Sequence, residues 1–217
     1  MSIAHSNISI FVPHIGCPNM CSFCNQRHIT GKNSAPKPQD VIDAVKVAVA
    51  SPKYNPTTTE IAFFGGSFTA INRTYMQSLL EAAYNFVKEG IVSGIRISTR
   101  PDAIDDEILL FLKKYGVTSI ELGAQSLNDN VLLLNNRGHS SHDVIDASLL
   151  IKKYGFSLGL QMMTGLYGDC DEFAIDTAKN IIALNPDTVR IYPTIVLKGT
   201  RLARLYNEGK YIPQQLD

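Results

Sequence analysis

The sequence predicts an α/β fold built on a single sheet of six parallel strands. Short apolar runs rich in β-branched residues alternate with longer segments of helical period. Strands that alternate with helices pair in parallel through right-handed crossovers. Six such units form either an open doubly wound sheet or an incomplete barrel, and the alternation alone does not choose between them.

Each predicted strand is a short apolar run that follows a turn or a helix stop. The six runs cover residues 8–12, 60–64, 94–98, 117–122, 156–162 and 188–191. Two helices end alike before a strand, in Lys-Lys-Tyr-Gly-Val at residues 113–117 and in Lys-Lys-Tyr-Gly-Phe at residues 152–156. This echo indicates a repeated helix-to-strand unit.

Three helices are predicted from their start and stop signals. One begins at Pro38, because proline suits the first turn of a helix. A second is capped by Asp105 and stops at Gly116, and a third is capped by Ser140 or Ser141 and stops at Gly155. We expect these helices to pack apolar faces against the sheet.

Polar residues and glycines gather where the predicted strands end, and this favours a barrel. In parallel α/β folds ligands bind at the carboxyl ends of the strands. The residues at these ends are Gly65, Gly66, Ser67, Ser98, Thr99, Arg100, Gln125, Ser126, Gln161 and Tyr192. We therefore expect the binding site at this edge of the sheet.

Length and composition indicate one globular domain, residues 1–217, and we expect the chain to end before a C-terminal region of a longer protein. Twenty Lys and Arg balance twenty Asp and Glu, so composition gives no electrostatic footprint for DNA or for an anionic membrane. No leader-like segment opens the chain, and no apolar run reaches the roughly 20 residues of a membrane helix. We expect a cytoplasmic protein.

Three of the four cysteines, Cys17, Cys21 and Cys24, lie in one loop with the spacing CxxxCxxC. In a reducing compartment this clustering favours metal binding over disulfides. Three thiolates on one loop can hold three corners of a 4Fe-4S cubane and leave the fourth iron open. An open iron can chelate S-adenosylmethionine (SAM) and pass one electron to its sulfonium.

Two other metal sites fit the same cysteines. A structural zinc site would take its fourth ligand from His14 or His28. An electron-transfer ferredoxin would need a fourth thiolate, and only Cys170, which we interpret as a loop thiol, is left. Phe23, directly before the last cysteine of the loop, can pack against an adenine ring or simply pack the loop.

The motifs together resemble the radical SAM superfamily over nearly the whole chain. CxxxCΦC with Phe23 looks like its cysteine signature, and Gly65-Gly66-Ser67-Phe68 resembles its GGE-type motif. Further segments are similar to the Elongator catalytic-subunit family, and oxygen-independent coproporphyrinogen oxidases share a weaker version. These segments are residues 97–102, 121–126, 137–139, 190–194 and 198–200.

This resemblance implies a partial (β/α)6 TIM-like barrel, a radical SAM core, with the cluster at the strand carboxyl ends. It implies that backbone at Gly65, Gly66 and Ser67 pairs with the SAM amino group. It places Gln125 at a ribose contact and Arg137 at the SAM carboxylate, roles that suit an amide and a guanidinium fork. Considered alone, the two glycines are a tight turn, Gln125 a cap and Arg137 a surface residue.

Some positions depart from the family pattern. Ser67 stands where many members carry glutamate, Ser98 where the coproporphyrinogen branch carries its ribose glutamate, and Gln161 where that branch carries aspartate. These changes remove charge but keep hydrogen-bonding capacity, so Ser98 and Gln161 stay candidate cofactor contacts. They fit the Elongator-like branch better.

The resemblance implies an enzyme that forms a 5′-deoxyadenosyl radical and depends on a flavodoxin- or ferredoxin-type reductant. Elongator-like members modify wobble uridine of tRNA, so the substrate is tRNA or, alternatively, a small molecule. Arg100 and Tyr192 are the candidate substrate contacts, whereas His139 and His142 are expected to be polar loop residues. The competing hypothesis is a non-catalytic zinc- or Fe-S-binding interaction module.

Overall fold

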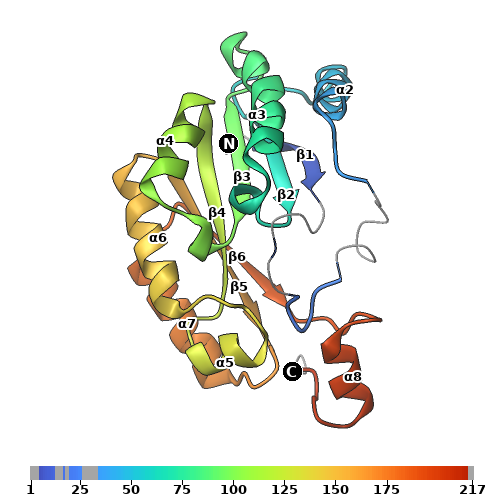
Figure 1. The fold of residues 1–217 in the computed structure, drawn as a ribbon, viewed down its shortest axis with the longest axis vertical. Coiled ribbons are helices and arrows are strands. Elements are labelled where there is room, and N and C mark those ends of the chain that lie inside the picture. The colour runs from blue at the N-terminus through green and yellow to red at the C-terminus, as the bar shows by residue number, and fades with distance from the viewer. Residues whose placement is uncertain (1–4, 13–16, 18–19, 26–33, 215–217) are drawn as a thin grey trace.

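A computed structural model describes residues 5–12, 17, 20–25 and 34–214, and its centre is one six-stranded sheet (Figure 1). The strands are β1 (Ser6–Val12), β2 (Thr59–Gly65), β3 (Gly94–Thr99), β4 (Val117–Gln125), β5 (Ser157–Thr164) and β6 (Thr188–Pro193). Every neighbouring pair is parallel, and the order in the sheet is the order in the chain. The sheet curls into a half-barrel, so the fold prediction is confirmed.

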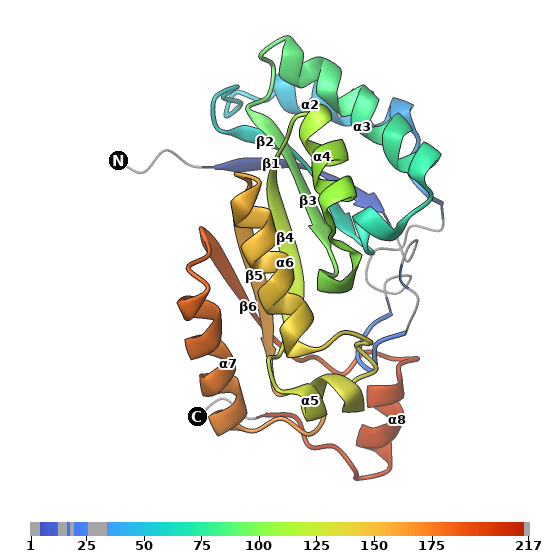
Figure 2. The ribbon, with the colours of Figure 1, turned by 60° about the vertical axis from the view of Figure 1, so that its left-hand side comes forward.

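Helices cover the outer side of this sheet, as Figures 1 and 2 show. The helices that contact strands are α2 (Pro38–Val49), α3 (Arg73–Lys88), α4 (Asp106–Lys114), α6 (Ser141–Lys153) and α7 (Asp171–Ala183). Two shorter helices, α5 (Asp129–Leu134) and α8 (Arg201–Asn207), lie toward the strand carboxyl ends (Figure 2). The 3₁₀ turns η1 (Phe68–Ala70) and η2 (Pro101–Ala103) follow β2 and β3 directly.

The predicted helix signals form the expected caps. Pro38 is the first residue of α2, the Asp105 carboxylate accepts the Ile108 N–H at 2.7 Å, and Ser140 rather than Ser141 caps α6. Gly116 adopts a φ of 71°, which glycine tolerates at a helix end. Helices α3, α5, α7 and α8 were not predicted from these signals, although the long apolar face of α3 carries the helical period.

Alternate residues of the strands point toward the helical layer and form one apolar core. Among the most buried of these residues are Ile61, Phe63, Ile95, Ile97, Ile120, Leu122, Leu158 and Leu160. Each buried side chain of this size contributes roughly 1.5–3 kcal/mol by leaving water. Because the core occupies one face, the residues between them must face the concave side of the half-barrel.

The concave face carries a chain of four paired charges, which we call the charge ladder: Glu60, Arg96 and Glu121 are buried, and Arg190 is partly exposed. Arg96 lies 2.8 Å from a Glu60 oxygen and 3.2 Å from a Glu121 oxygen. Arg190 reaches the same Glu121 oxygen at 2.9 Å. Since the four residues come from β2, β3, β4 and β6, the ladder ties four strands together on the concave side.

At Glu60 the neighbouring charge and hydrogen bonds lower the pKa by more than burial raises it. Burial acts to raise the pKa of Glu60, but the Arg96 charge and hydrogen bonds from Thr118 and His5 hold that pKa below its ordinary value. A depressed carboxylate pKa stabilises the fold at neutral pH, and this contribution disappears as the pH falls through the acidic range. Glu60 therefore contributes its part of this stabilisation only while it is ionised.

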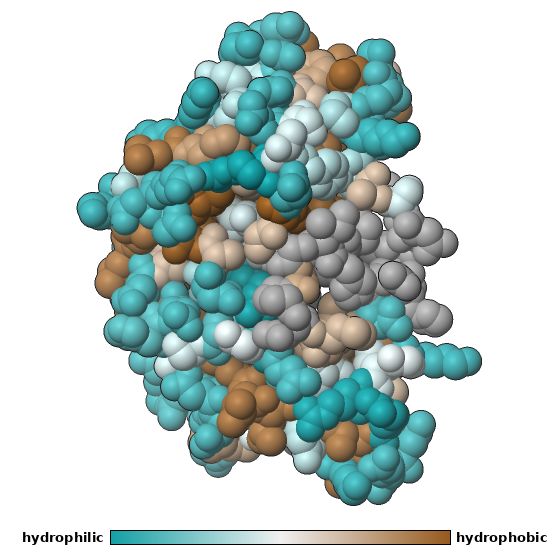
Figure 3. Space-filling model, in the orientation of Figure 1, coloured by the Kyte–Doolittle hydropathy of each residue, from teal (hydrophilic) through white to brown (hydrophobic). Residues whose placement is uncertain are grey.

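The visible surface is largely polar. Figure 3 shows one face on which hydrophilic side chains predominate and apolar ones form small separate groups. Scattered exposed apolar residues are ordinary for a folded domain. None of the helices in the described residues has both the length and the apolar character needed to cross a bilayer.

Removing the central carboxylate of the ladder should destabilise the fold. Glu121→Ala leaves Arg96 and Arg190 without their shared partner, and we expect a loss of about 3 kcal/mol or more of unfolding free energy in urea. Asp43→Ala is the matched control, because it breaks the exposed Asp43–Lys46 pair and should cost under about 0.5 kcal/mol. Equal effects of the two variants would contradict a stabilising ladder.

Candidate functional site

The predicted cysteine loop lies at the carboxyl ends of the strands, and its described part is Cys17 with residues 20–25. All three cysteines are partly exposed, and the Cys24 N–H donates to the Cys21 carbonyl at 3.1 Å. No three His, Cys, Asp or Glu side chains in the described residues form a ready-made coordination sphere. The three cysteines therefore share one loop, but among the described residues their side chains do not form a complete metal-coordination sphere.

Ser22 fastens this loop to two elements far away in the sequence. Its N–H donates to the carbonyl of Asn135, just after α5, at 3.1 Å, and its hydroxyl donates to the Asn135 side chain. Its carbonyl accepts the N–H of Leu202, in α8, at 2.8 Å. Ser22 and Asn135 are both buried, so this latch fixes the cysteines between α5 and α8. No sequence pattern predicts these contacts of Ser22, because Asn135 and Leu202 lie far from it in the chain.

The environment of Cys17 contains groups that favour a thiolate. Burial raises the pKa of Cys17, while a hydrogen bond from the backbone of Ser67 and the charges of Arg100 and Arg137 oppose that rise. The Arg137 guanidinium also donates through Nη1 to the Cys21 sulfur at 3.1 Å. Positive groups thus surround two of the three predicted ligands.

The turn after β2 requires glycine. Gly65 has a φ of +116°, and a Cβ built there would lie 2.6 Å from the Val12 carbonyl oxygen. The next amide, Gly66 N–H, donates to that same carbonyl at 2.8 Å. Both observations follow from the close approach of β1 and β2 where they end.

Ser67 uses its side chain in the framework rather than toward a ligand. It is fully buried, its hydroxyl lies 2.8 Å from the Thr99 hydroxyl, and it accepts the Arg100 N–H at 3.3 Å. These bonds join the ends of β2 and β3. What Ser67 offers the site is its backbone, which is the part that the sequence prediction assigned to cofactor binding.

The end of β4 brings Gln125 and Arg137 together. Gln125 has a φ of 67°, unusual for a residue other than glycine, and it follows an irregularity in the β4–β5 pairing. A Cβ built on Gly123 would lie 2.8 Å from the Gln125 amide nitrogen and 3.5 Å from Arg137 Nη2. The amide and the guanidinium therefore lie over the same glycine, and positive-φ strain of this kind is typical of functional sites.

The other predicted cofactor contacts, Ser98 and Gln161, belong to the surroundings of Glu121. The Gln161 amide donates to a Glu121 oxygen at 2.7 Å, and the Ser98 hydroxyl faces the same oxygen at 3.5 Å. Glu121 thus links both residues to the charge ladder on the concave face.

The two candidate substrate contacts differ in availability. Arg100 is buried, and its fork makes two bonds of 2.9 Å to Asp102. Tyr192 is exposed on β6, and its hydroxyl accepts a weak bond from Arg190 at 3.5 Å. Only Tyr192 presents an open surface to a substrate.

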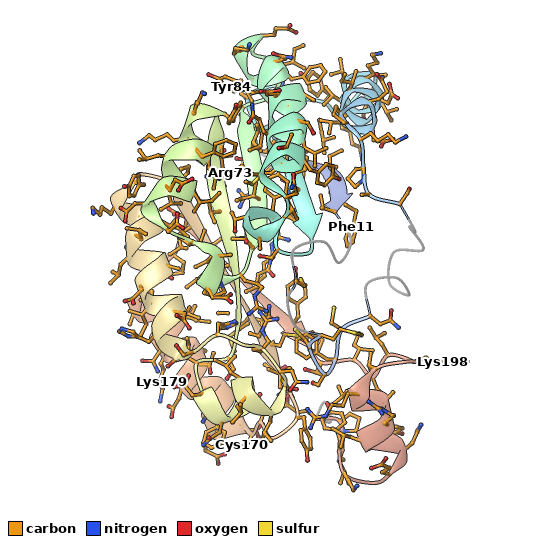
Figure 4. All side chains as sticks on the ribbon, viewed as in Figure 1. Phe11, Arg73, Tyr84, Cys170, Lys179 and Lys198 are labelled. Carbon is orange, nitrogen blue, oxygen red and sulfur yellow. The ribbon has the colours of Figure 1, made fainter. Side chains whose placement is uncertain are left out.

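The remaining candidates have simple positions. Phe23 is partly buried in the cysteine loop, which suits both adenine packing and loop packing. Cys170 is exposed directly before α7, on a different segment from the cysteine loop (Figure 4). His14 and His28, the candidate zinc ligands, lie outside the described residues.

His139 lies in the loop directly before the Ser140 cap of α6, as expected, but its side chain is not exposed to solvent. It is buried, its Nε2 lies 3.2 Å from the Ala124 carbonyl oxygen, and its Nδ1 has no hydrogen-bond partner in the described part of the chain. Burial and the neighbouring Arg137 charge lower the pKa of His139 to about 4. The imidazole is therefore neutral in the fold at physiological pH.

Comparison with known proteins identifies the family. The family model described as "Radical SAM superfamily" matches residues 11–181, which include the cysteine loop, the end of β1 and all of β2 to β5. The chain belongs to the radical SAM superfamily. A second model, the radical SAM C-terminal domain, matches residues 186–217. Membership of this superfamily confirms the prediction of an enzyme.

Curated relatives confirm the Elongator-like resemblance. A tRNA uridine(34) acetyltransferase of Dehalococcoides mccartyi is 25% identical over 95% of this chain and 52% of its own length. That of Methanocaldococcus infernus is 34% identical over 66% of this chain and 28% of its own length. Elongator complex protein 3 of Mus musculus is 31% identical over 70% and 31%, respectively. The chain spans about half or less of the length of these relatives.

Solved radical SAM structures share the fold. The Elp3 of Methanocaldococcus infernus superposes with a TM-score of 0.76 at 23% identity, over 96% of this chain and 50% of its own. Coproporphyrinogen III oxidase of Escherichia coli superposes with a TM-score of 0.64 at 20% identity, over 95% and 47%. Both support the half-barrel.

The residues of the cysteine loop fit the 4Fe-4S cluster that is typical of the radical SAM family. Three cysteine thiols carry the right donor atoms, a backbone amide and a guanidinium donate to two of them, and buried Arg137 Nε lacks a partner among the described residues. Thiolate-bound clusters are anionic, so hydrogen-bond donors and positive charge around the sulfurs suit them.

The buried imidazole of His139 should make the stability of the fold depend on pH. Its folded pKa of about 4 lies below the ordinary 6.5, so the unfolded chain binds the proton more tightly and stability falls as the pH drops from 6.5 toward 4. The loss has an upper bound of ~3 kcal/mol. Urea unfolding of the metal-free chain at several pH values should show a flatter profile for His139→Gln.

His142→Gln is the control for this measurement, because His142 is exposed on α6. It should keep the pH profile of the parent chain. A parent-like profile for His139→Gln would contradict a buried neutral imidazole.

Proposed function

We propose that Cys17, Cys21 and Cys24 hold a 4Fe-4S cluster and that the chain binds SAM beside it. The observation that carries this proposal is the latched cysteine loop, with donors at two of its sulfurs, in a chain of the radical SAM superfamily. Bound together, the cluster and SAM supply a 5′-deoxyadenosyl radical that takes a hydrogen atom from the substrate. The protein's task is to bind, orient and shield the reactants.

The residues at the strand ends would bind SAM. We expect backbone at Gly65, Gly66 and Ser67 to pair with the SAM amino group, because the backbone of Ser67 already donates to the Cys17 sulfur and Gly65 lies where β1 and β2 approach each other closely. Gln125 and Arg137 lie over Gly123, where an amide can bond a ribose diol and a guanidinium can bond a carboxylate.

Three further residues complete the proposed SAM site. Phe23 would pack against the adenine, and Ser98 and Gln161 would contribute hydrogen bonds from the concave face. The Gln161 amide nitrogen donates to Glu121, so the amide oxygen of Gln161 is the atom that would accept a hydrogen bond from a ligand.

A tRNA nucleoside is the substrate class we propose, with a small molecule as the alternative. Support comes from the relatives, which are named tRNA uridine(34) acetyltransferases and Elongator complex protein 3. Tyr192, which is exposed on the concave face, would contact the substrate. Arg100, which is buried and bonded to Asp102, would contribute to the substrate site without an open surface of its own.

The cellular setting follows from the chemistry. A flavodoxin- or ferredoxin-type protein would deliver the electron, and cysteines clustered for metal binding fit a reducing, cytoplasmic compartment. We propose that residues 1–217 act as one radical SAM core.

The test of this function is an anaerobic assay. After reconstitution with iron and sulfide, the chain should bind about four irons. With dithionite and SAM it should release 5′-deoxyadenosine, measured by chromatography. A chain that carries its full iron but releases none would refute the enzymatic proposal.

The ligand assignment is tested by single substitutions. Cys17→Ala, Cys21→Ala and Cys24→Ala should each abolish the iron-sulfur absorbance, because each removes one of three ligands. Cys170→Ala is the control and should retain full iron. Loss of iron in this control would show that the assignment is wrong.

The same metal analysis separates the enzyme from a zinc- or Fe-S-binding interaction module. One zinc per chain without iron absorbance would favour the module. About four irons per chain would exclude a structural zinc site.

A further inference from the structure

Arg137 is the buried guanidinium closest to the predicted ligands. It follows α5, is 7% exposed, and donates through Nη1 to Cys21 Sγ at 3.1 Å and through Nη2 to the Gly123 carbonyl at 2.6 Å. One side chain thus joins the cysteine loop to the irregular end of β4.

Arg137 differs from the buried residues Arg96 and Arg100 in the partners of its positive charge. Arg96 lies between two glutamates, and Arg100 is paired with Asp102. Within the described ranges no carboxylate forms an ion pair with Arg137, and its Nε, also buried, has no partner. A buried cation without a counter-charge is costly, so the site requires an anion.

The neighbours of Arg137 identify that anion. Its Nη1 donates to the Cys21 sulfur at 3.1 Å, whereas the Gly123 carbonyl that accepts from Nη2 is uncharged. A neutral His139 adds no second positive charge. The groups beside Arg137 that can become anionic are the thiols of Cys17 and Cys21.

We infer that Arg137 is a positioning residue that supplies the counter-charge and an N–H donor to the Cys21 thiolate of the bound cluster, and so raises the cluster's reduction potential. This inference rests on the proposed function. Reduction adds one negative charge to the cluster, so a cation 3.1 Å from a ligand sulfur stabilises the reduced form more than the oxidised form. Hydrogen bonds to the sulfurs are among the factors that set such potentials.

This role differs from binding the SAM carboxylate, because it acts without SAM. The potential of the reconstituted cluster can therefore be measured by spectroelectrochemistry in the absence of SAM. Arg137→Gln removes the charge, whereas Arg137→Lys keeps the charge but loses the planar fork.

The expected result is full iron content with a more negative potential in Arg137→Gln and an intermediate potential in Arg137→Lys. Arg201→Gln is the matched control: it removes a cation that donates to the Leu134 carbonyl, near the latch, without touching a sulfur. Its potential should equal that of the parent chain.

Other outcomes decide between the proposals. A parent chain that binds no iron would refute the proposed function, not the role of Arg137 within it. A parent-like potential in any iron-loaded Arg137 variant would overturn the inference, and weaker SAM binding with unchanged potential would assign Arg137 to the carboxylate alone. Should Arg137→Gln fail to load iron, the potential of Arg137→Lys decides.

Discussion

Six parallel strands that end at one edge of a single sheet are the constraint on which the site depends. Parallel pairing in chain order brings the turn after β2, the irregular end of β4 and the exposed end of β6 to the same side. The cysteine loop comes from the end of β1 and reaches the same edge. Residues separated by more than a hundred positions, such as Cys21 and Arg137, therefore meet.

Charged side chains have different partners on the concave face and at the cysteine loop. On the concave face every member of the charge ladder has an opposite partner, and Glu121 serves two arginines. At the loop, Arg137 meets a sulfur and a carbonyl instead. The first arrangement completes a scaffold, whereas the second is suited to an anionic ligand shell.

Much of this architecture was predictable because it depends on local chemistry. Apolar runs and capping residues such as Asp105 and Ser140 gave the strands and three helices close to their observed bounds. The polar strand ends pointed to the edge of the sheet where the cysteine loop lies. Local signals did not reveal that Arg100 is engaged by Asp102 or that His139 is buried, since both depend on which side of a turn faces the core.

The sequence by itself predicted a sheet of six parallel strands, because periodicity and capping are properties of neighbouring residues. Its motifs added the resemblance to the radical SAM superfamily, which implied the half-barrel and the three proposed cysteine ligands. Only the tertiary structure decided that Ser22 latches the loop, that Ser67 offers backbone rather than side chain, and that Arg137 lacks a carboxylate partner in the described residues. Those facts depend on distances and burial between segments far apart in the chain. No local pattern encodes them.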